Sequence, residues 1–385
     1  MIKVGFIGTI SKEWIGGLNY FKNLLIALNR TEKKELDIYV YVGEKTDIET
    51  KKMFKKYATV IECSLFDRKS MKWFLMKIEE KVFGTNFILE KTLKKNNLDI
   101  LSHSSITNFR NLKTINWIPD FQHIHLPQMF SKKEVNQRNN HYLKLIKQSD
   151  SIIVSSHDAL KDLKKFAPRF EKKSSVLQFV SQPDDSYYDL DENGKDKLKQ
   201  KYNIEDDFFY IPNQIWKHKN HMLVIEAIKL LKSENIEISI ICSGYQIDYR
   251  NKSYIEHIKS IIKMNKLNKN IKLLGLIDYS DVFALMKISK AVINPSLFEG
   301  WSSTVEECKS VGKNMILSDL DVHKEQYPEA TFFDRHNAES LKNVLKNYED
   351  ENIISQKKLL TERTKEFADN YVVIVKEVIQ TSPNR

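Results

Sequence analysis

The stretch Asn294-Pro-Ser-Leu-Phe-Glu-Gly-Trp-Ser-Ser-Thr-Val-Glu-Glu307 decides the fold of this chain. The apolar run Ala291–Asn294, which ends at a proline, predicts a strand. Ser303-x-x-Glu306 has the spacing of a capping box and predicts a helix that starts near Ser303. A short loop with a tight turn at Glu299-Gly300 therefore joins a strand to a helix. Open α/β sheets bind their ligands at such carboxyl ends of strands.

The predicted helix start suits an anionic ligand. Free backbone N–H groups and the positive end of the helix dipole attract a group such as a diphosphate. Glu299 and Glu307 flank this position, and carboxylates accept hydrogen bonds from pairs of hydroxyl groups. The pattern favours a ligand that has both phosphate and sugar hydroxyls. For an isolated pair of glutamates, a helix cap and a turn residue are the simpler interpretation.

The composition indicates a folded globular protein with two domains. The chain has 385 residues, of which 41% are hydrophobic and 29% charged. This length is sufficient for two domains that each have their own core. No run of about 18 apolar residues is present, and the start of the chain resembles a strand more than a signal peptide. Cys63, Cys242 and Cys308 are scattered and have no metal-ligand spacing. We therefore expect a cytoplasmic protein without disulfides or a metal site.

The charge of the chain is concentrated in its first half. Residues 1–180 contain 32 Lys and Arg against 19 Asp and Glu, whereas the whole chain contains 61 against 51. Such an excess attracts nucleic acid, acidic lipid headgroups or a phosphorylated acceptor. The most basic segment is Lys51–Lys95.

A predicted helix from Met71 onward carries an apolar face within this basic segment. The face consists of Met71, Phe74, Leu75, Ile78 and Val82, widened by Trp73, Met76 and Phe83, with Lys69, Lys72, Lys77 and Lys81 beside it. The pattern fits a helix that faces the core and equally a helix that lies on an anionic membrane surface.

Strands and helices alternate along both halves of the chain. The strand Ile2–Gly8, the pair Gly16-Gly17 and the helix Leu18–Asn29 form the first unit of this kind. The alternation predicts an α/β protein with two doubly wound parallel sheets. The pattern predicts a first domain over 1–180, a Pro- and Asp-containing linker over 181–204, a second domain over 205–365 and a last helix in 366–385.

The chain resembles a known family at the stretch that decides its fold. Pro-Ser-x-x-Glu-Gly, Glu307 and Gly312-Lys-Asn-Met-Ile-Leu-Ser-Asp319 resemble the donor-site signature of retaining glycosyltransferases of family 4, also called glycosyl transferases group 1. The resemblance implies the GT-B fold, in which two Rossmann-like domains face a cleft. The first domain would receive the acceptor, the second would bind a nucleotide-sugar donor, and the helix in 366–385 would pack back on the first domain.

The resemblance also implies roles for individual residues. Glu299 would bind donor-sugar hydroxyls near the developing positive charge, Glu307 the ribose, and Lys219 the diphosphate. Gln214 occupies the position where the family has an arginine, and Lys217 or His218 are candidates to offset this change. The expected donor-binding residues are Gly16, Gly17, Asn213, Gln214, Lys219, Gly300, Ser302, Ser303, Thr304 and Glu307.

The loop Pro119-Asp-Phe-Gln-His-Ile-His-Leu-Pro127 contains two histidines after a predicted strand. His123 and His125 could bind a metal, but no further clustered ligand supports such a site. Either could also be a structural histidine. In the family, an acceptor-side histidine lies in this loop, but the family's His-Asp pair stands here as Pro119-Asp120. We assign His123 as catalytic together with Glu299 and Lys219, and the alternatives are that His125 or neither histidine takes this role.

These implications together indicate a retaining, metal-independent glycosyltransferase without a cofactor. It would move a sugar from a UDP- or GDP-sugar to a glycan or lipid-diphosphate-linked acceptor in the synthesis of a cell-envelope polysaccharide such as lipopolysaccharide or capsule. We expect it in the cytoplasm, peripherally associated with the inner face of the membrane. The alternatives are an epimerase-like GT-B enzyme that acts on nucleotide sugars, and a nucleic-acid-binding protein. The basic half lacks the stacked aromatics of a recognisable nucleic-acid-binding module.

Overall fold

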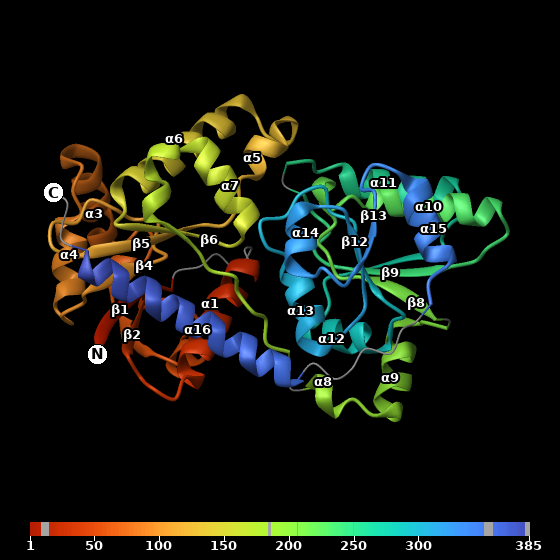
Figure 1. Ribbon diagram of the computed structural model, residues 1–385, viewed down its shortest axis with the longest axis horizontal. Coiled ribbons are helices and arrows are strands. Elements are labelled where there is room, and N and C mark those ends of the chain that lie inside the picture. Colours follow the sequence, from red (N-terminus) through yellow and green to blue (C-terminus); the bar gives the residue numbers. More distant parts are fainter. Residues whose placement is uncertain (9–14, 184–185, 206, 249, 350–356, 382–385) are drawn as a thin grey trace. The chain divides into compact units, whose positions relative to one another are not determined.

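The computed structural model describes residues 1–385 except 9–14, 184–185, 206, 249, 350–356 and 382–385. The chain forms two compact units (Figure 1). The first contains Met1–Phe121, Ser131–Val180 and Thr361–Arg385, and the second contains Gln122–Phe130 and Ser181–Leu360. In the described part of the chain, no helix is both long and apolar enough to cross a membrane.

The first unit is built on a seven-stranded parallel sheet with the order β3-β2-β1-β4-β5-β6-β7. Its strands are β1 (Ile2–Ile7), β2 (Leu36–Val42), β3 (Thr59–Glu62), β4 (Ile100–Ser102), β5 (Lys113–Ile118), β6 (Ser151–Val154) and β7 (Ser174–Val176). The inner strands β4, β5 and β6 are largely buried, as is typical of parallel sheets that are covered on both faces, whereas the edge strands β3 and β7 are partly exposed.

Helices cover this sheet and include the end of the chain. They are α1 (Ile15–Arg30), α2 (Ile48–Lys55), α3 (Met71–Phe83), α4 (Phe87–Lys94), α6 (Lys132–Gln148), α7 (His157–Phe166) and α16 (Lys357–Gln380). Figure 1 shows α16 beside α1, and the ring centres of Tyr20 in α1 and Phe367 in α16 lie 6.4 Å apart. The Tyr371 hydroxyl donates to Ser102 Oγ at 2.8 Å. Buried aromatic and polar contacts thus join the last helix to the first sheet.

The second unit is built on a six-stranded parallel sheet with the order β10-β9-β8-β11-β12-β13. Its strands are β8 (Phe208–Ile211), β9 (Ser239–Ser243), β10 (Ile271–Gly275), β11 (Val292–Asn294), β12 (Met315–Ser318) and β13 (Thr331–Phe333). Its helices are α5 (Gln122–His125), α8 (Ser186–Asp189), α9 (Glu192–Tyr202), α10 (His221–Ser233), α11 (Tyr254–Met264), α12 (Tyr279–Ile288), α13 (Ser303–Val311), α14 (Asp321–Gln326) and α15 (Ala338–Lys346).

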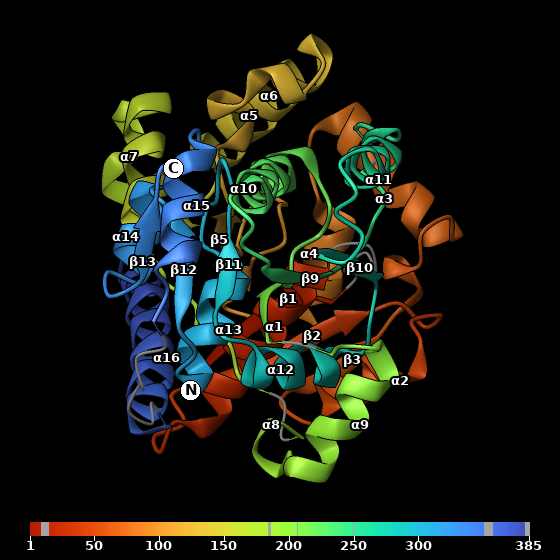
Figure 2. The ribbon, with the colours of Figure 1, turned by 90° about the vertical axis from the view of Figure 1, so that its right-hand side faces the viewer.

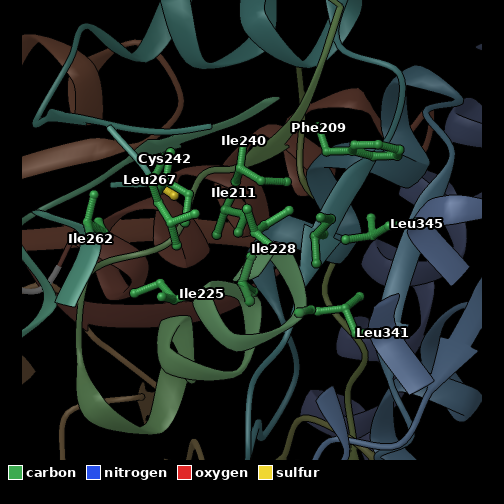
Figure 3. Packing of buried hydrophobic residues seen from close by; sticks show 14 of the residues in the cluster. Phe209, Ile211, Ile225, Ile228, Ile240, Cys242, Ile262, Leu267, Leu341 and Leu345 are labelled. Carbon is green, nitrogen blue, oxygen red and sulfur yellow. The ribbon is translucent and has the colours of Figure 1, made fainter. Parts of the chain in front are cut away.

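Two apolar layers hold this sheet between helices. Side chains of α10, α11 and α15 pack on one face; Figure 3 shows Ile225 and Ile228 of α10 with Leu341 and Leu345 of α15. Figure 2 shows α10 and α15 side by side. Side chains of α9, α12 and α13 pack on the other face. Both sheets therefore have the doubly wound α/β architecture that the alternating pattern predicts.

The segment 181–204, which we expected to be a linker, differs from that expectation. It contains α8 and α9, and Leu198 and Ile204 are buried in the core of the second unit. The Tyr187 hydroxyl also donates to the Val311 carbonyl at 3.1 Å. The polar composition of the segment, with Pro183 and several aspartates, indicated a linker although a few apolar residues anchor it.

The structure contradicts one of the two interpretations of the apolar face of α3, namely that this face packs on the core. Only Met76 of this helix is buried, and Trp73 is half-buried. Met71, Phe74, Leu75, Ile78 and Val82 lie on the other side, and each is between 51% and 80% exposed. The face therefore does not contribute to the core.

Gly244 has a fixed place at the carboxyl end of β9. Its φ is +139°, and a Cβ there would lie 2.5 Å from the Asn213 carbonyl oxygen and 2.8 Å from the Gln214 nitrogen. Gly84, at the end of α3, has a φ of +66° and no heavy atom within 4 Å of a Cβ. Both positions disfavour a side chain, but only Gly244 also has a steric conflict with backbone.

We predict that Gly244→Ala lowers the free energy of unfolding by more than about 2 kcal/mol, because the backbone at Asn213 must move. Gly84→Ala is the matched control and should cost only about 1 kcal/mol, from its backbone conformation alone. Urea denaturation of both variants measures the difference. Equal costs would contradict the close approach at Gly244.

Candidate active site

The candidate site lies where the strand order of the second sheet reverses. β8 and β11 are neighbours there, although the chain visits β9 and β10 between them. Asn213 follows β8 and Asn294 ends β11, and Asn213 Nδ2 donates to Asn294 Oδ1 at 3.2 Å. Ligands of open α/β sheets bind at such a switch point, outside the carboxyl ends of the strands.

The helix α13 begins at this point, and its N-cap residue lies one position before Ser303, the cap that the capping-box spacing predicts. Ser302 is the N-cap residue, and its side chain accepts from the Val305 N–H. Asn294 Nδ2 donates to Ser302 Oγ at 2.9 Å, and the Gln326 side chain binds the Ser302 N–H and carbonyl at 3.0 and 2.9 Å. The predicted capping box from Ser303 to Glu306 is wrong, because the side chains of Asn294 and Gln326 fix Ser302 as the cap.

Glu306 has a structural role instead. It is fully buried and accepts from Gln326 Nε2 at 3.0 Å and pairs with Lys309 at 3.5 Å. Ser303 and Gly300 are half-buried at the helix start. Thr304 is buried, and its hydroxyl donates to Asn213 Oδ1 at 3.0 Å. These contacts leave Glu299 and Glu307 as the two glutamates of the stretch that the local packing does not explain.

Lys219 and Glu299 form an ion pair at the centre of the site. Lys219 Nζ donates to Glu299 Oε1 at 2.6 Å, and the two side chains are 15% and 11% exposed. The Ser296 hydroxyl donates to the same carboxylate oxygen at 2.7 Å. Burial raises the pKa of Glu299, but the positive charge of Lys219 and the two hydrogen bonds outweigh it and lower the pKa to about 2. Glu299 is thus ionised throughout the physiological range.

Glu307 lies in the second turn of α13 and has the opposite electrostatic environment. It is buried and accepts a hydrogen bond from the Tyr279 hydroxyl at 2.9 Å. Burial raises its pKa to about 7, against a smaller lowering by the Tyr279 hydrogen bond. Two glutamates of the same stretch therefore differ in charge state near neutral pH.

The remaining predicted donor-side residues are placed as follows. Asn213 is buried and Gln214 is half-buried. Gly16 and Gly17 lie in the first turn of α1, which begins at Ile15, and not in the loop before it. That predicted loop falls mainly on 9–14, outside the described residues.

The two histidines of the predicted acceptor-side loop belong to the second unit, together with Lys219 and Glu299. They form the short helix α5 and do not share one environment. His123 is fully buried, whereas His125 is exposed and its ring lies 5.1 Å from that of Phe298, the residue before Glu299. The described residues contain no group of three or more His, Cys, Asp or Glu side chains that could hold a metal ion.

The sequence interpretation missed His221 and His323 at this edge of the sheet and named His218 only as a candidate to offset Gln214. All three histidines are buried, and burial lowers the pKa values of His218, His221 and His323 to about 3, 3 and 4. His323 Nδ1 lies 3.0 Å from the Ser318 carbonyl, and the Ser318 hydroxyl donates to the Ser296 carbonyl at 2.7 Å. Two of the histidines stand beside Lys219 in the sequence, a pattern that could have indicated a buried polar loop. His323 had no such signal.

Comparisons with known proteins agree with this geometry. Residues 194–367, somewhat under half of the chain, match the family model described as "Glycosyl transferases group 1". A sequence search of curated proteins gives no match.

Solved structures share the fold over almost the whole chain. A glycosyltransferase from Rickettsia africae ESF-5 has a TM-score of 0.66 at 16% identity, covering 99% of both chains. Alr3699/HepE from Anabaena, in complex with UDP and glucose, has a TM-score of 0.67 at 13% identity, covering 98% of this chain and 100% of its own. WaaG, a glycosyltransferase involved in lipopolysaccharide biosynthesis, has a TM-score of 0.59 at 14% identity, covering 99% and 100%.

The matching family model supports a glycosyltransferase, and the solved structures show a shared fold. The expected resemblance is confirmed: residues 194–367 match glycosyl transferases group 1, and the chain has the GT-B fold.

Proposed function

We propose that this protein transfers a sugar from a nucleotide-sugar donor to an acceptor hydroxyl, with retention of the anomeric configuration and without a metal ion. The single observation that carries the proposal is the ion pair of Lys219 and Glu299 beside the start of α13. A buried ion pair at a ligand-binding edge is a poor source of stability and therefore favours a functional role.

The donor diphosphate would bind between Lys219 and the N-terminus of α13. When the bond between the sugar and the diphosphate breaks, negative charge grows on the leaving oxygen. Lys219 and the free N–H groups of the helix start are fixed positive potentials that stabilise this charge without reorganisation. Gln214, where the resemblance implies an arginine, adds no charge here.

The two glutamates would hold the two sugars of the donor. Glu299, ionised by its partner Lys219, would accept from the transferred sugar and face the positive charge that develops on its ring. Glu307 would accept from the ribose hydroxyls. His123 or His125 would contact the acceptor, and His125, which is exposed beside Phe298, is the more accessible of the two.

The identity of the donor and acceptor is proposed from chemistry and from similar structures. Alr3699/HepE was solved with UDP and glucose, which favours UDP over GDP as the donor nucleotide. WaaG and the outer-core galactosyltransferase WaaB act in lipopolysaccharide biosynthesis. We therefore propose a glycan or lipid-diphosphate-linked acceptor in the synthesis of a cell-envelope polysaccharide, with the protein at the cytoplasmic face of the membrane.

A screen of UDP- and GDP-sugars with lipid-linked and free glycan acceptors, read by product mass, tests the proposal. A mass increase of one sugar residue that depends on the acceptor supports transfer. Conversion of the donor sugar without an acceptor would point to the epimerase-like alternative. Binding to oligonucleotides that weakens steeply with salt, without transfer, would favour the nucleic-acid-binding alternative.

We predict that two isosteric substitutions separate the roles of the glutamates. Glu299→Gln should lower kcat by about 10²–10³ with little change in nucleotide affinity, because its charge matters most in the transition state. Glu307→Gln should weaken nucleotide binding at pH 8 by about 1–3 kcal/mol, because it removes a charge-assisted hydrogen bond. Calorimetric titration and initial rates measure both. The reverse assignment, or no effect of either change on a folded protein, would refute these roles.

The raised pKa of Glu307 predicts a dependence of stability on pH. Between about 4.5 and 7 the folded protein retains a proton that the unfolded chain has lost, so stability falls as pH rises through this window and levels off above it. The Glu307→Gln variant lacks this loss, and its unfolding free energy relative to the wild type should rise by about 1–3 kcal/mol from pH 5 to pH 8. Urea denaturation measures it. A difference that does not change with pH would show that Glu307 is not buried as a neutral acid.

The exposed face of α3 supports the proposed membrane association. Met71, Phe74, Leu75, Ile78 and Val82 form an exposed apolar stripe, and Phe83 and Phe87 are exposed nearby. Lys69, Lys72, Lys77 and Lys81 are exposed around it. An apolar stripe with flanking lysines matches the two parts of an anionic bilayer surface, its acyl boundary and its headgroups.

We predict that the protein binds vesicles that contain phosphatidylglycerol at low salt and does not bind neutral vesicles. Each lysine near the surface contributes about 1 kcal/mol, which salt screens. Replacing Lys69, Lys72, Lys77 and Lys81 by Glu should abolish co-sedimentation. The matched control replaces Lys252, Lys259, Lys263 and Lys269, which are exposed in the second unit, and should retain it. Equal pelleting of both quadruple variants, or none by the wild type, would contradict the proposal.

A further inference from the structure

Arg250 is a buried cation in the loop between β9 and α11 that the proposed reaction does not use. Its side chain is 8% exposed, and that of Asp248 is 2% exposed. Asp248 Oδ1 accepts from the Arg250 backbone N–H at 3.0 Å and from Nε at 3.4 Å. Asp248 Oδ2 accepts from the Lys217 backbone N–H at 3.3 Å. The pair thus joins this loop to the loop that carries Lys219.

The guanidinium makes two further contacts with two other segments of the second unit. Arg250 Nη1 donates to Gln122 Oε1 at 3.1 Å, and Nη2 donates to His218 Nδ1 at 3.2 Å. Gln122 immediately precedes His123, and His218 immediately precedes Lys219. One planar group therefore binds the neighbours of a proposed acceptor-side residue and of the proposed diphosphate ligand.

Two aromatic rings fix the plane of this group. The Arg250 guanidinium carbon lies 5.2 Å from the centre of the Phe130 ring and 5.3 Å from that of Trp216. The quadrupoles of the two rings attract the cation and favour one orientation of its plane. Phe130 and Gln122 are the two ends of the segment Gln122–Phe130, so Arg250 contacts both ends of the segment that carries His123 and His125.

His218 connects this arrangement to the ion pair. Arginine can only donate, so His218 Nδ1 is the acceptor and Nε2 carries the proton of the neutral ring. The His218 carbonyl accepts from the Leu297 N–H at 2.8 Å, two residues before Glu299. A displacement of Arg250 would therefore reach the loops of both Lys219 and Glu299.

We propose that Arg250 is a positioning residue that holds the acceptor-side segment Gln122–Phe130 and the Lys219 loop in one fixed geometry for sugar transfer. The activity readout rests on the proposed function. Lysine at this position keeps the positive charge, but its single ammonium group cannot reproduce the two-pronged planar contact.

Steady-state kinetics of Arg250→Lys, Gln122→Ala and the double variant test the proposal. We expect each single change to lower kcat for transfer at least about tenfold with a change of less than about threefold in donor KM. The double variant should be no slower than Arg250→Lys, because both changes break one contact. Arg169→Lys, an exposed arginine of the first unit, should transfer at the wild-type rate. Additive losses in the double variant, wild-type kcat in Arg250→Lys, or an equal loss in kcat and donor affinity would overturn the proposal.

A second readout does not depend on activity and separates failure of this inference from failure of the proposed function. Two-bond ¹H–¹⁵N spectra of histidine-labelled protein, assigned with a His218→Gln variant, report which ring nitrogen carries the proton. We expect His218 to be protonated on Nε2 in the wild type, with its Nδ1 resonance shifted by the hydrogen bond from Arg250, and we expect this shift to be lost in Arg250→Met, which has no donor. The same Nδ1 resonance in both proteins would overturn the assignment of Arg250, even in a protein that transfers sugar. Absence of transfer by the wild type together with the expected spectra would refute only the proposed function.

Discussion

The ion pair of Lys219 and Glu299 is the interaction on which the site depends. Its two side chains come from the loops after β8 and β11, which are separated along the chain but adjacent at the switch point of the sheet. Removal of two charges from water costs several kcal/mol per ion, and the site offsets this cost with a 2.6 Å contact and a hydrogen bond from Ser296. The amides of Asn213 and Asn294 then connect these loops to the start of α13.

The same stretch contains two glutamates with different protonation behaviour, and the difference follows from their partners. Glu299 faces a cation, and its pKa falls to about 2, whereas Glu307 faces only the Tyr279 hydroxyl and its pKa rises to about 7. A permanently charged carboxylate suits contact with a ring that gains positive charge. A carboxylate that is costly to ionise when buried gains most from hydroxyl donors supplied by a ligand. Environment, and not residue type, separates the two roles that we propose.

Much of the architecture could be predicted because local patterns determine it. The strands Ile2–Ile7 and Val292–Asn294 and the helix from Ser303 lie within a residue of their expected bounds. Short apolar runs and end signals suffice for such elements. The cap of α13 was misplaced because Ser302 and Ser303 are equivalent in local sequence, and only the distant side chains of Asn294 and Gln326 distinguish them. The apolar face of α3 could not be assigned because periodicity does not state what covers a face.

The site itself could be predicted only as far as a resemblance implied it. Glu299, Lys219 and Glu307 stand in the matching positions, but no local pattern shows that the first two are in contact, since 80 residues separate them. Arg250 and His323 had no sequence signal. Their importance follows from the topology, which brings the loops after β9 and β12 beside those after β8 and β11. Side chains from sequence-distant loops meet at the edge of a parallel sheet, and only the fold shows which of them do.

The central claim is that the Lys219–Glu299 pair is maintained for chemistry and not for stability. The double variant Lys219→Met/Glu299→Leu tests it most directly, because it replaces both charges by apolar side chains of similar size and leaves neither charge unpaired. Its free energy of unfolding and its rate of sugar transfer are the quantities to measure. We predict that the free energy of unfolding of the double variant lies within about 1 kcal/mol of the wild-type value or above it. Its rate of sugar transfer should fall at least about 10³-fold. A stable double variant that transfers sugar within tenfold of the wild-type rate, or one that no longer folds, would contradict it.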